Sequence, residues 1–355
     1  MEMIFKKYLM PGFIFQSLII GGGYGTGREI VEFFVQYGPV HGLYNMLIAA
    51  IIWSVVLAIC FELCRIGKNY DYRSFLKSLM GKSWIAYEYL FLFGLVLVVS
   101  VMGSASGEII NEMFGVNSIF GISLMMILVS LIVYYGSGLI EKVFSVWSII
   151  LYIGFIFLFI STFIKFDHQI FSSFDFQDQS LSKINGGIKY AAYNIGLAPA
   201  IFFCAKYFNS RNEAMISGLM AGLIGMFPAL LMFISMLSKY QDILSAPVPV
   251  NIILNNIGSP FFTFFFQLIL FGTFIETGAG LIHGFNERIM NTNPNLSNNW
   301  RTILSLTILI ASIFLAAKIG LINLIASGYG FITWGYWLVF VLPVLIIGSL
   351  KIMKN

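Results

Sequence analysis

Long apolar runs, separated by short polar or charged breaks, dominate the sequence. A membrane-spanning helix needs roughly 20 predominantly apolar residues, and runs of about this length recur along the chain. None of them alternates between apolar and polar residues in the way of a membrane β-strand. We therefore expect an all-α polytopic membrane protein with about ten transmembrane helices, which cover residues 9–36, 39–64, 84–112, 119–138, 142–164, 184–206, 213–238, 260–287, 300–317 and 320–349.

The composition supports the same class of protein. Charged residues make up only 10% of the 355 residues, and hydrophobic residues reach 59%. A typical soluble protein has about 25% charged residues, so this chain cannot cover a water-exposed surface and is expected in a lipid bilayer. Collagen, disordered and disulfide-rich classes are excluded on the same grounds.

The basic residues orient the predicted helices, because cytoplasmic loops carry an excess of Lys and Arg. With the N-terminus in the cytoplasm, four of the 20 Lys and Arg fall outside and two, Arg28 and Lys189, lie within spans. The other fourteen fall inside: Lys6, Lys7, Arg65, Lys68, Arg73, Lys77, Lys82, Lys142, Lys206, Arg211, Arg288, Arg301, Lys351 and Lys354. Both termini are thus expected in the cytoplasm, and the net positive charge reflects topology and implies no nucleic acid.

The predicted helices divide into two groups of five. The longest polar loop, from Phe166 to Lys183, separates residues 1–164 from residues 184–355. Because five is an odd number, the second group enters the membrane from the opposite side. We therefore expect a 5+5 inverted repeat within one transporter domain of residues 1–355, a plan that recurs in secondary transporters.

The first helix of each group contains a helix-breaking segment. Residues 21–27 include five glycines, each costing about 1 kcal/mol in a helix relative to Ala, and Pro199 interrupts the sixth helix. Irregular backbone at membrane depth persists only where it lines a cavity or is buried in protein. Close packing at the glycines and a simple kink at the proline are the alternative interpretation. The candidate substrate-binding residues are Gly23, Tyr24, Gly25, Thr26, Gly27, Asn194, Gly196 and, on the third helix, Ser104.

Five plus five helices with the first and sixth broken resemble the LeuT-type fold of the amino acid–polyamine–organocation superfamily. The string GGGYGTGREIVE at residues 21–32, followed by Phe33 and Phe34, is similar to the first-helix signature of YkvI-like bacterial membrane proteins, G-A-G-F-A-[ST]-G-x-E-I-x-x-F-F. Tyr24 replaces a Phe, and Arg28 stands where Gln is common. The resemblance implies a secondary transporter related to amino acid symporters, with central contacts from helices 1, 3, 6 and 8.

The eighth helix carries candidate ion-coupling residues. Thr273, Glu276 and Thr277 lie on one helical face. In the related fold this stretch faces the broken first helix and forms a sodium site from hydroxyls and carbonyls. Burial favours the protonated form of a carboxyl group, so Glu276 is equally a candidate proton carrier. A structural carboxyl bonded to a neighbouring helix is the third interpretation.

Charged residues beyond the first break suggest an outer gate. Arg28 and Lys189 are predicted to pair with Glu29, Glu32 or Glu108, because an ionisable residue inside a membrane needs a partner. A static ion-pair network near the membrane surface is the alternative.

The predicted function is ion-coupled symport of a small polar organic solute, an amino acid or related zwitterion, by alternating access. Free N–H groups at the first break would bind a carboxylate, and carbonyls at residues 194–197 with Ser104 would bind the amine. A membrane sensor that binds a solute without transporting it is the alternative function. No catalytic signature or metal-ligand spacing occurs, so we expect no enzyme, no metal and no cofactor beyond Na⁺ or H⁺ as the coupling ion. The expected location is the bacterial cell membrane, and the sequence leaves the oligomeric state open.

Overall fold

Helices make up almost all of the structure. The computed structural model describes residues 2–135, 137–175, 184–292 and 299–354, and no β-strand occurs within those ranges. Seven of the described helices are long and apolar enough to cross a membrane alone, and an eighth candidate is a bent pair of shorter helices. The all-α membrane architecture expected from the hydrophobic pattern is therefore confirmed.

The helices of the first half follow the predicted spans. After α1 (Glu2–Ile4), the first span consists of α2 (Met10–Ile19), α3 (Gly22–Gly25) and α4 (Arg28–Phe33). The next four are α5 (Pro39–Gly67), α7 (Trp84–Phe114), α8 (Ser118–Tyr135) and α9 (Ser137–Ser172). The short helix α6 (Tyr72–Met80) was not expected. Asp71 caps it by accepting the N–H of Ser74 at 2.9 Å, as an N-cap residue does.

The second half has the same plan. Its broken span consists of α10 (Asn185–Ile195) and the 3₁₀ helix η5 (Ala198–Tyr207). α11 (Arg211–Leu237), α13 (Pro260–Thr292) and α14 (Asn299–Ile319) follow, and the last span runs from α15 (Leu321–Asn323) through η6 (Leu324–Tyr329) and α16 (Gly330–Tyr336) to α17 (Ser349–Lys354). The short helix α12 (Pro249–Ile257), between α11 and α13, was also not expected.

The predicted start of the central loop is wrong. A loop is expected from Phe166, but α9 bends at that residue (φ −134°, ψ 26°) and continues to Ser172. Ile170 is buried in this extension, so tertiary packing stabilises a segment that is too polar to be recognised as part of a span. Lys183, used above for orientation, lies outside the described residues, as do the side chains of Lys142 and Arg288.

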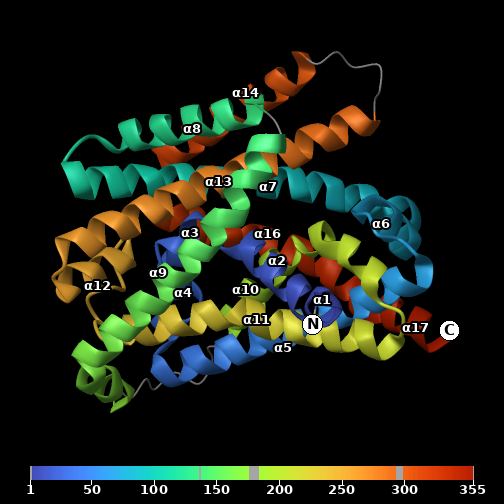
Figure 1. The fold of residues 1–355 in the computed structure, drawn as a ribbon, viewed down its shortest axis with the longest axis horizontal. Helices are drawn as coiled ribbons and strands as arrows, with labels where there is room; N and C mark the ends of the chain where they lie inside the picture. Colours follow the sequence, from blue (N-terminus) through green and yellow to red (C-terminus); the bar gives the residue numbers. More distant parts are fainter. Residues whose placement is uncertain (1, 136, 176–183, 293–298, 355) are drawn as a thin grey trace.

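The two halves pack with exchanged partners. α2 packs on α11, and its counterpart α10 packs on α5; in the same way α7 packs on α14, and α13 packs on α8. Figure 1 shows α7, α8, α13 and α14 along one side of the molecule and α5 and α11 along the other, with α2, α3, α10 and α16 between them. Inverted repeats require such an exchange, while the exact boundaries at residues 164 and 184 remain a prediction.

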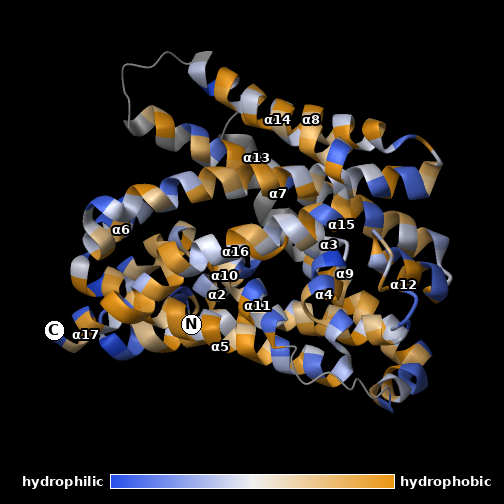
Figure 2. Cartoon of the chain, turned by 180° about the vertical axis from the view of Figure 1, so that it is seen from behind, coloured by the Kyte–Doolittle hydropathy of each residue, from blue (hydrophilic) through white to orange (hydrophobic). Residues whose placement is uncertain are grey.

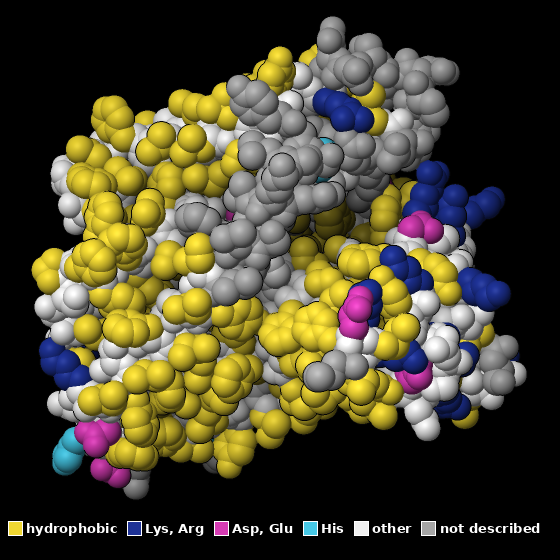
Figure 3. Space-filling view, viewed as in Figure 1, with side chains coloured by type: hydrophobic (Ala, Val, Ile, Leu, Met, Phe, Trp, Pro, Cys, Tyr) yellow, Lys and Arg dark blue, Asp and Glu magenta, His cyan; other side chains and the backbone are white. Residues whose placement is uncertain are grey.

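The surface along the long helices is apolar. Hydrophobic residues cover α8 and α14, whereas hydrophilic residues are frequent around α6 and α12 (Figure 2). Many exposed side chains in mid-helix are large and apolar, among them Ile127, Phe157, Phe264, Ile310 and Leu338. An exposed apolar surface of this extent suits a lipid environment and not water. Lys and Arg gather at the end of the molecule that carries α6 and α17, opposite α12 (Figures 1 and 3).

Candidate functional site

The first span is broken twice within its glycine-rich segment. α2 ends at Ile19, and the chain is extended at Gly21 before α3 begins. The second break is at Gly27, whose φ of 81° lies in the left-handed region that Gly adopts without a steric penalty. Between the breaks, the Thr26 hydroxyl donates to the carbonyls of Gly22 and Gly23 at 2.9 and 3.1 Å. The predicted break of the first helix is therefore present.

The sixth span is broken between α10 and η5, which are bent by 64° relative to each other. Pro199 lies at the start of η5, where the missing N–H removes no helical hydrogen bond. The carbonyl of Gly196 accepts the hydroxyl of Tyr87 at 2.7 Å, so α7 holds the break in place. A Cβ at Gly196 would lie 2.5 Å from the Tyr336 ring, which explains the need for glycine there.

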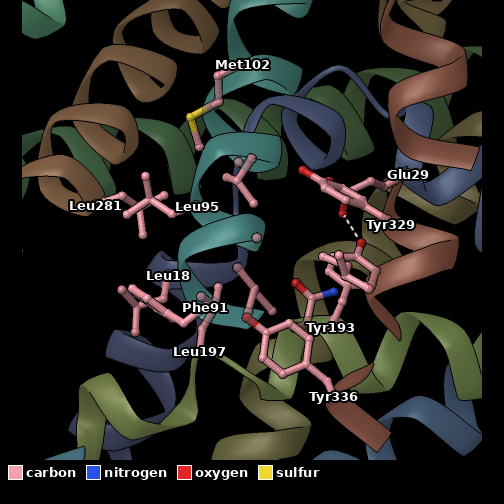
Figure 4. A pocket seen from close by; sticks show the side chains of 16 residues that line it. Leu18, Glu29, Phe91, Leu95, Met102, Tyr193, Leu197, Leu281, Tyr329 and Tyr336 are labelled. Carbon is pink, nitrogen blue, oxygen red and sulfur yellow. Dashed lines mark hydrogen bonds between the residues drawn. The ribbon is translucent and has the colours of Figure 1, made fainter. Parts of the chain in front are cut away.

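A small central cavity lies between the two broken spans. Its volume is about 30 Å³, which has room for water but not for an organic solute. Figure 4 shows two groups of lining side chains: Glu29, Tyr193, Tyr329 and Tyr336 lie on one side, and the apolar Leu18, Phe91, Leu197 and Leu281 lie on the other. The cavity thus has one aromatic, polar wall and one apolar wall.

Glu29 reaches the central cavity from α4. Its carboxylate accepts the Tyr193 hydroxyl at 2.5 Å (Figure 4) and the backbone N–H of Tyr24. The carboxylate lies directly against Gly23, where a Cβ would be 2.4 Å from Oε1. Glu29 is 2% exposed and forms no ion pair with any described Lys, Arg or His. This residue, predicted for an outer gate, therefore joins the first and sixth spans across the centre of the molecule.

A larger cavity of about 350 Å³ lies on the α6 side of the breaks. Its lining includes Ser17 of α2, Tyr72 of α6 and Pro199 of η5. Four side chains line both cavities and separate one from the other: Leu18, Phe91, Leu197 and Leu281. We call these four residues the apolar partition.

Glu276 of α13 faces the larger cavity. It is 6% exposed, and its carboxylate forms no hydrogen bond or ion pair with the described residues. Thr277 lines the same cavity, and its hydroxyl donates to the carbonyl of Ile20 at the first break, 3.5 Å away. The Thr273 hydroxyl instead donates to Ile269 of its own helix at 2.8 Å. Thr277 thus makes the expected contact between the eighth span and the broken first span, and Glu276 lies beside it.

Arg28 fastens the segment before α12 to the first span. Its guanidinium donates to the carbonyls of Leu244 and Ala246 at 2.8 and 3.2 Å, and it pairs with Glu32 at 3.2 Å. The N–H of Val250 adds a hydrogen bond to the Thr26 carbonyl at 3.1 Å. We call this set of contacts the clasp. It fastens the first span to α12 and to the segment before it.

The other two predicted gate residues do not join the clasp. Among the described residues, Lys189 has no ion-pair partner, and its backbone carbonyl accepts the Thr333 hydroxyl. Glu108 is half-buried on α7 and is not in contact with Arg28, whereas Glu112, one turn further on, accepts a hydrogen bond from Asn251 of α12. The structure therefore brings Arg28 and Glu32 together and leaves Lys189 and Glu108 apart.

Most of the predicted substrate-binding residues lie behind the cavity wall. Tyr24 is buried with its ring 6.1 Å from that of Phe155, and Ser104 is buried without lining either cavity. Of the eight predicted residues, Asn194 lines the central cavity, and the remaining seven, Gly23, Tyr24, Gly25, Thr26, Gly27, Ser104 and Gly196, do not.

The sequence analysis did not identify the three tyrosines that line the central cavity, Tyr193, Tyr329 and Tyr336. Tyr193 lies three residues before Gly196, so its helical spacing from the break carried a usable signal. Tyr329 and Tyr336 belong to the last span, more than 130 residues away along the chain, and no local pattern connects them to the break.

Comparison with known sequences finds one relative of uncharacterised function. No family model matches the chain. The uncharacterised membrane protein YkvI of Bacillus subtilis (strain 168) is 24% identical over 292 residues, which cover 79% of this chain and 81% of YkvI. The similarity agrees with the resemblance noted at residues 21–34.

Solved transporter structures share the fold. A substrate-bound, outward-open Na⁺-coupled sialic acid symporter matches with a TM-score of 0.67 at 13% identity, over 95% of this chain and 78% of the symporter. MhsT in complex with L-phenylalanine matches with a TM-score of 0.64 at 17% identity, over 97% of each chain. Inward-facing Mhp1 gives 0.53 at 16% identity, over 92% of this chain and 76% of Mhp1. The chain is thus a membrane protein of the LeuT-type fold with sequence similarity to YkvI.

Proposed function

We propose that the protein is a secondary active transporter that moves a small polar organic solute, an amino acid or related zwitterion, together with a coupling ion. The observation that carries this proposal is Glu276, a buried carboxylate beside the contact between Thr277 and Ile20 at a broken helix. An unpaired ionisable group within a membrane costs at least about 2.5–3.5 kcal/mol. A cation bound by the carboxylate, the hydroxyl and the carbonyl offsets that cost.

Sodium is the favoured coupling ion. Hard cations prefer oxygen ligands, and all three groups present oxygen. One of the fold neighbours is a Na⁺-coupled symporter, which supports the same choice. A proton on Glu276 is the alternative, because it neutralises the same carboxylate.

The two closures of the central cavity support alternating access. The clasp links the first span to the α12 region, and we assign it the closure on that side; the apolar partition separates the central cavity from the larger one on the α6 side. Opening one closure while the other stays shut exposes the cavity to one side of the membrane at a time. The gathering of Lys and Arg at the α6 end supports a cytoplasmic position for that end and for both termini, in the bacterial plasma membrane.

The test is uptake of a pool of labelled amino acids into proteoliposomes, under an imposed sodium gradient and separately under a proton gradient. We expect uptake under the sodium gradient and its loss in Glu276→Gln, which removes the charge at nearly constant volume. Glu112→Gln is the matched control, because Glu112 bonds Asn251 outside both cavities, and it is expected to retain uptake. Absence of uptake under both gradients, with thermal stabilisation of the protein by the same pool, would contradict transport and indicate a sensor.

A further inference from the structure

The central cavity holds a carboxylate without a compensating cation among the described residues. Glu29 is bonded to the Tyr193 hydroxyl and the Tyr24 N–H, both of them neutral donors. Arg28 is next to it in sequence, but both terminal nitrogens of its guanidinium are engaged in the clasp, and it forms no ion pair with Glu29. A carboxylate removed from water without an opposite charge is unfavourable in a membrane interior. An ionised Glu29 therefore calls for a mobile cation in the cavity.

The polar positions around Glu29 include an acceptor that an ammonium group can reach. Asn194 lines the cavity and donates its amide N–H to the Tyr190 carbonyl at 3.1 Å, which leaves its amide oxygen as an acceptor. The Tyr193 hydroxyl donates its proton to Glu29, and the hydroxyls of Tyr329 and Tyr336, which also line the cavity, can donate or accept. A primary or secondary ammonium group carries two or three N–H donors, so it satisfies the carboxylate and the amide oxygen together.

The walls of the cavity favour an organic cation over a metal ion. Tyr193 and Tyr329 stack with their ring centroids 4.6 Å apart, and both line the cavity with Tyr336 (Figure 4). Aromatic faces attract ammonium groups, whereas a hard metal ion needs a nearly complete shell of oxygen ligands. The apolar partition on the opposite wall suits a hydrocarbon body.

We infer that Glu29 and Asn194 bind the ammonium group of a solute with an apolar body, and that this body lies against the apolar partition. The inference rests on the proposed function and narrows the class of its solute. It also reverses the polarity expected from the sequence, because the Tyr24 N–H at the first break is occupied by the protein's own carboxylate. Since the central cavity measures about 30 Å³, binding requires the partition to move and to join this cavity with the larger one.

The test uses four phenyl compounds that differ in their polar group: 2-phenylethylamine, phenylalanine, 3-phenylpropionate and 2-phenylethanol. A series of alkylamines from ethylamine to hexylamine covers different sizes of the apolar body. Thermal unfolding of the purified full chain in detergent is followed against the concentration of each compound. We expect the ammonium compounds to raise Tm, and the carboxylate-only and neutral compounds to leave it unchanged.

Variants locate the binding group. Glu29→Gln is expected to weaken the response to amines by about tenfold or more, as loss of a charge-assisted hydrogen bond does, while Glu112→Gln keeps it. Tyr193→Phe removes the hydroxyl that holds Glu29 and is expected to weaken the response a few-fold. Tyr190→Phe is its matched control, because the buried Tyr190 hydroxyl has no hydrogen-bond partner among the described residues. The intact apo stability of each variant shows that it has folded.

Several outcomes would overturn the inference. They are an absence of stabilisation by every amine, equal stabilisation by 3-phenylpropionate, an unchanged amine response in Glu29→Gln, or stabilisation by sodium that Glu29→Gln alone removes. Amine binding without any uptake would leave the inference standing and overturn the proposed transport. Uptake of a solute that lacks an ammonium group, at the same rate in the wild type and in Glu29→Gln, would overturn the inference and leave the proposed transport standing.

Discussion

Glu29 and Glu276 are two buried carboxylates near the broken first span, and their surroundings differ. Glu29 is held by a tyrosine hydroxyl and a backbone N–H in a cavity of about 30 Å³. Glu276 faces a cavity of about 350 Å³ and forms no hydrogen bond with the described residues. The first carboxylate is fixed in direction, whereas the second is free to adjust.

The different surroundings of the two carboxylates favour a different kind of cation at each. A carboxylate fixed beside an amide oxygen and aromatic rings suits the directional N–H donors of an organic ammonium group. A free carboxylate beside a hydroxyl and a backbone carbonyl suits a small spherical ion, which gathers oxygen ligands from several elements. We therefore propose that one broken span serves two cation sites, on opposite sides of the apolar partition, so that a solute and an ion bind together without competing for one carboxylate.

The largest effect on this arrangement is expected from Gly27→Ala. Gly27 turns the chain between α3 and α4 so that Glu29 lies back against Gly23, and its φ of 81° disfavours a side chain. A Cβ there would also lie 1.9 Å from Cε of Met236, so that side chain must move. We expect the free energy of unfolding to fall by about 2–3 kcal/mol, measured by thermal or denaturant unfolding.

Gly284→Ala is the control for this substitution. Gly284 lies within α13, where a Cβ has no atom within 4 Å, so alanine is expected to be neutral or stabilising by up to about 1 kcal/mol. Equal stability of Gly27→Ala and the wild type would show that the left-handed turn does not position Glu29.

A smaller effect is expected at the clasp. Arg28→Met removes hydrogen bonds to two carbonyls and the ion pair with Glu32, so the free energy of unfolding should fall by about 1–2 kcal/mol, and uptake should slow. Lys189→Met is expected to leave both quantities unchanged, because Lys189 has no ion-pair partner among the described residues. Loss of uptake in Lys189→Met, with normal uptake in Arg28→Met, would contradict this expectation and support the outer gate predicted from the sequence.

The smallest effect is expected at the two threonines of α13. Thr277→Ala removes the hydroxyl that touches the first break. The apparent affinity for sodium, measured from uptake against sodium concentration, should fall a few-fold, which corresponds to about 1 kcal/mol. Thr273→Ala removes a hydroxyl bonded to its own helix and should have the weaker effect. An equal loss in both variants would place the ion along the whole face of α13 and away from the break.

The sequence predicts the parts of this structure that depend on local chemistry. Apolar run length locates the spans, the glycines at residues 21–27 and Pro199 locate the breaks, and the i, i+4 spacing of Arg28 and Glu32 predicts their pairing. The short helix α6 escaped prediction although Asp71 and Gly81 mark its two ends, because it is too short and too polar to be read as a span.

The role of Glu29 could not be predicted, because it depends on a change of direction between two breaks. Arg28, Glu29 and Glu32 share α4, and the left-handed turn at Gly27 that precedes this helix brings Glu29 back against Gly23, on the other side of the turn. The partners of Glu29 on α10 and its neighbours on the last span are brought close only by tertiary packing. Sequence spacing is therefore reliable within a helix and fails at a break.

The most direct test of two separate cation sites is a pair of titrations on the wild type, Glu29→Gln and Glu276→Gln. Tm is followed against 2-phenylethylamine and, separately, against sodium chloride that replaces potassium chloride at constant ionic strength. We predict that Glu29→Gln loses the amine response and keeps the sodium response, and that Glu276→Gln does the opposite. Loss of both responses from one substitution, or an amine response that survives in Glu29→Gln, would contradict the account.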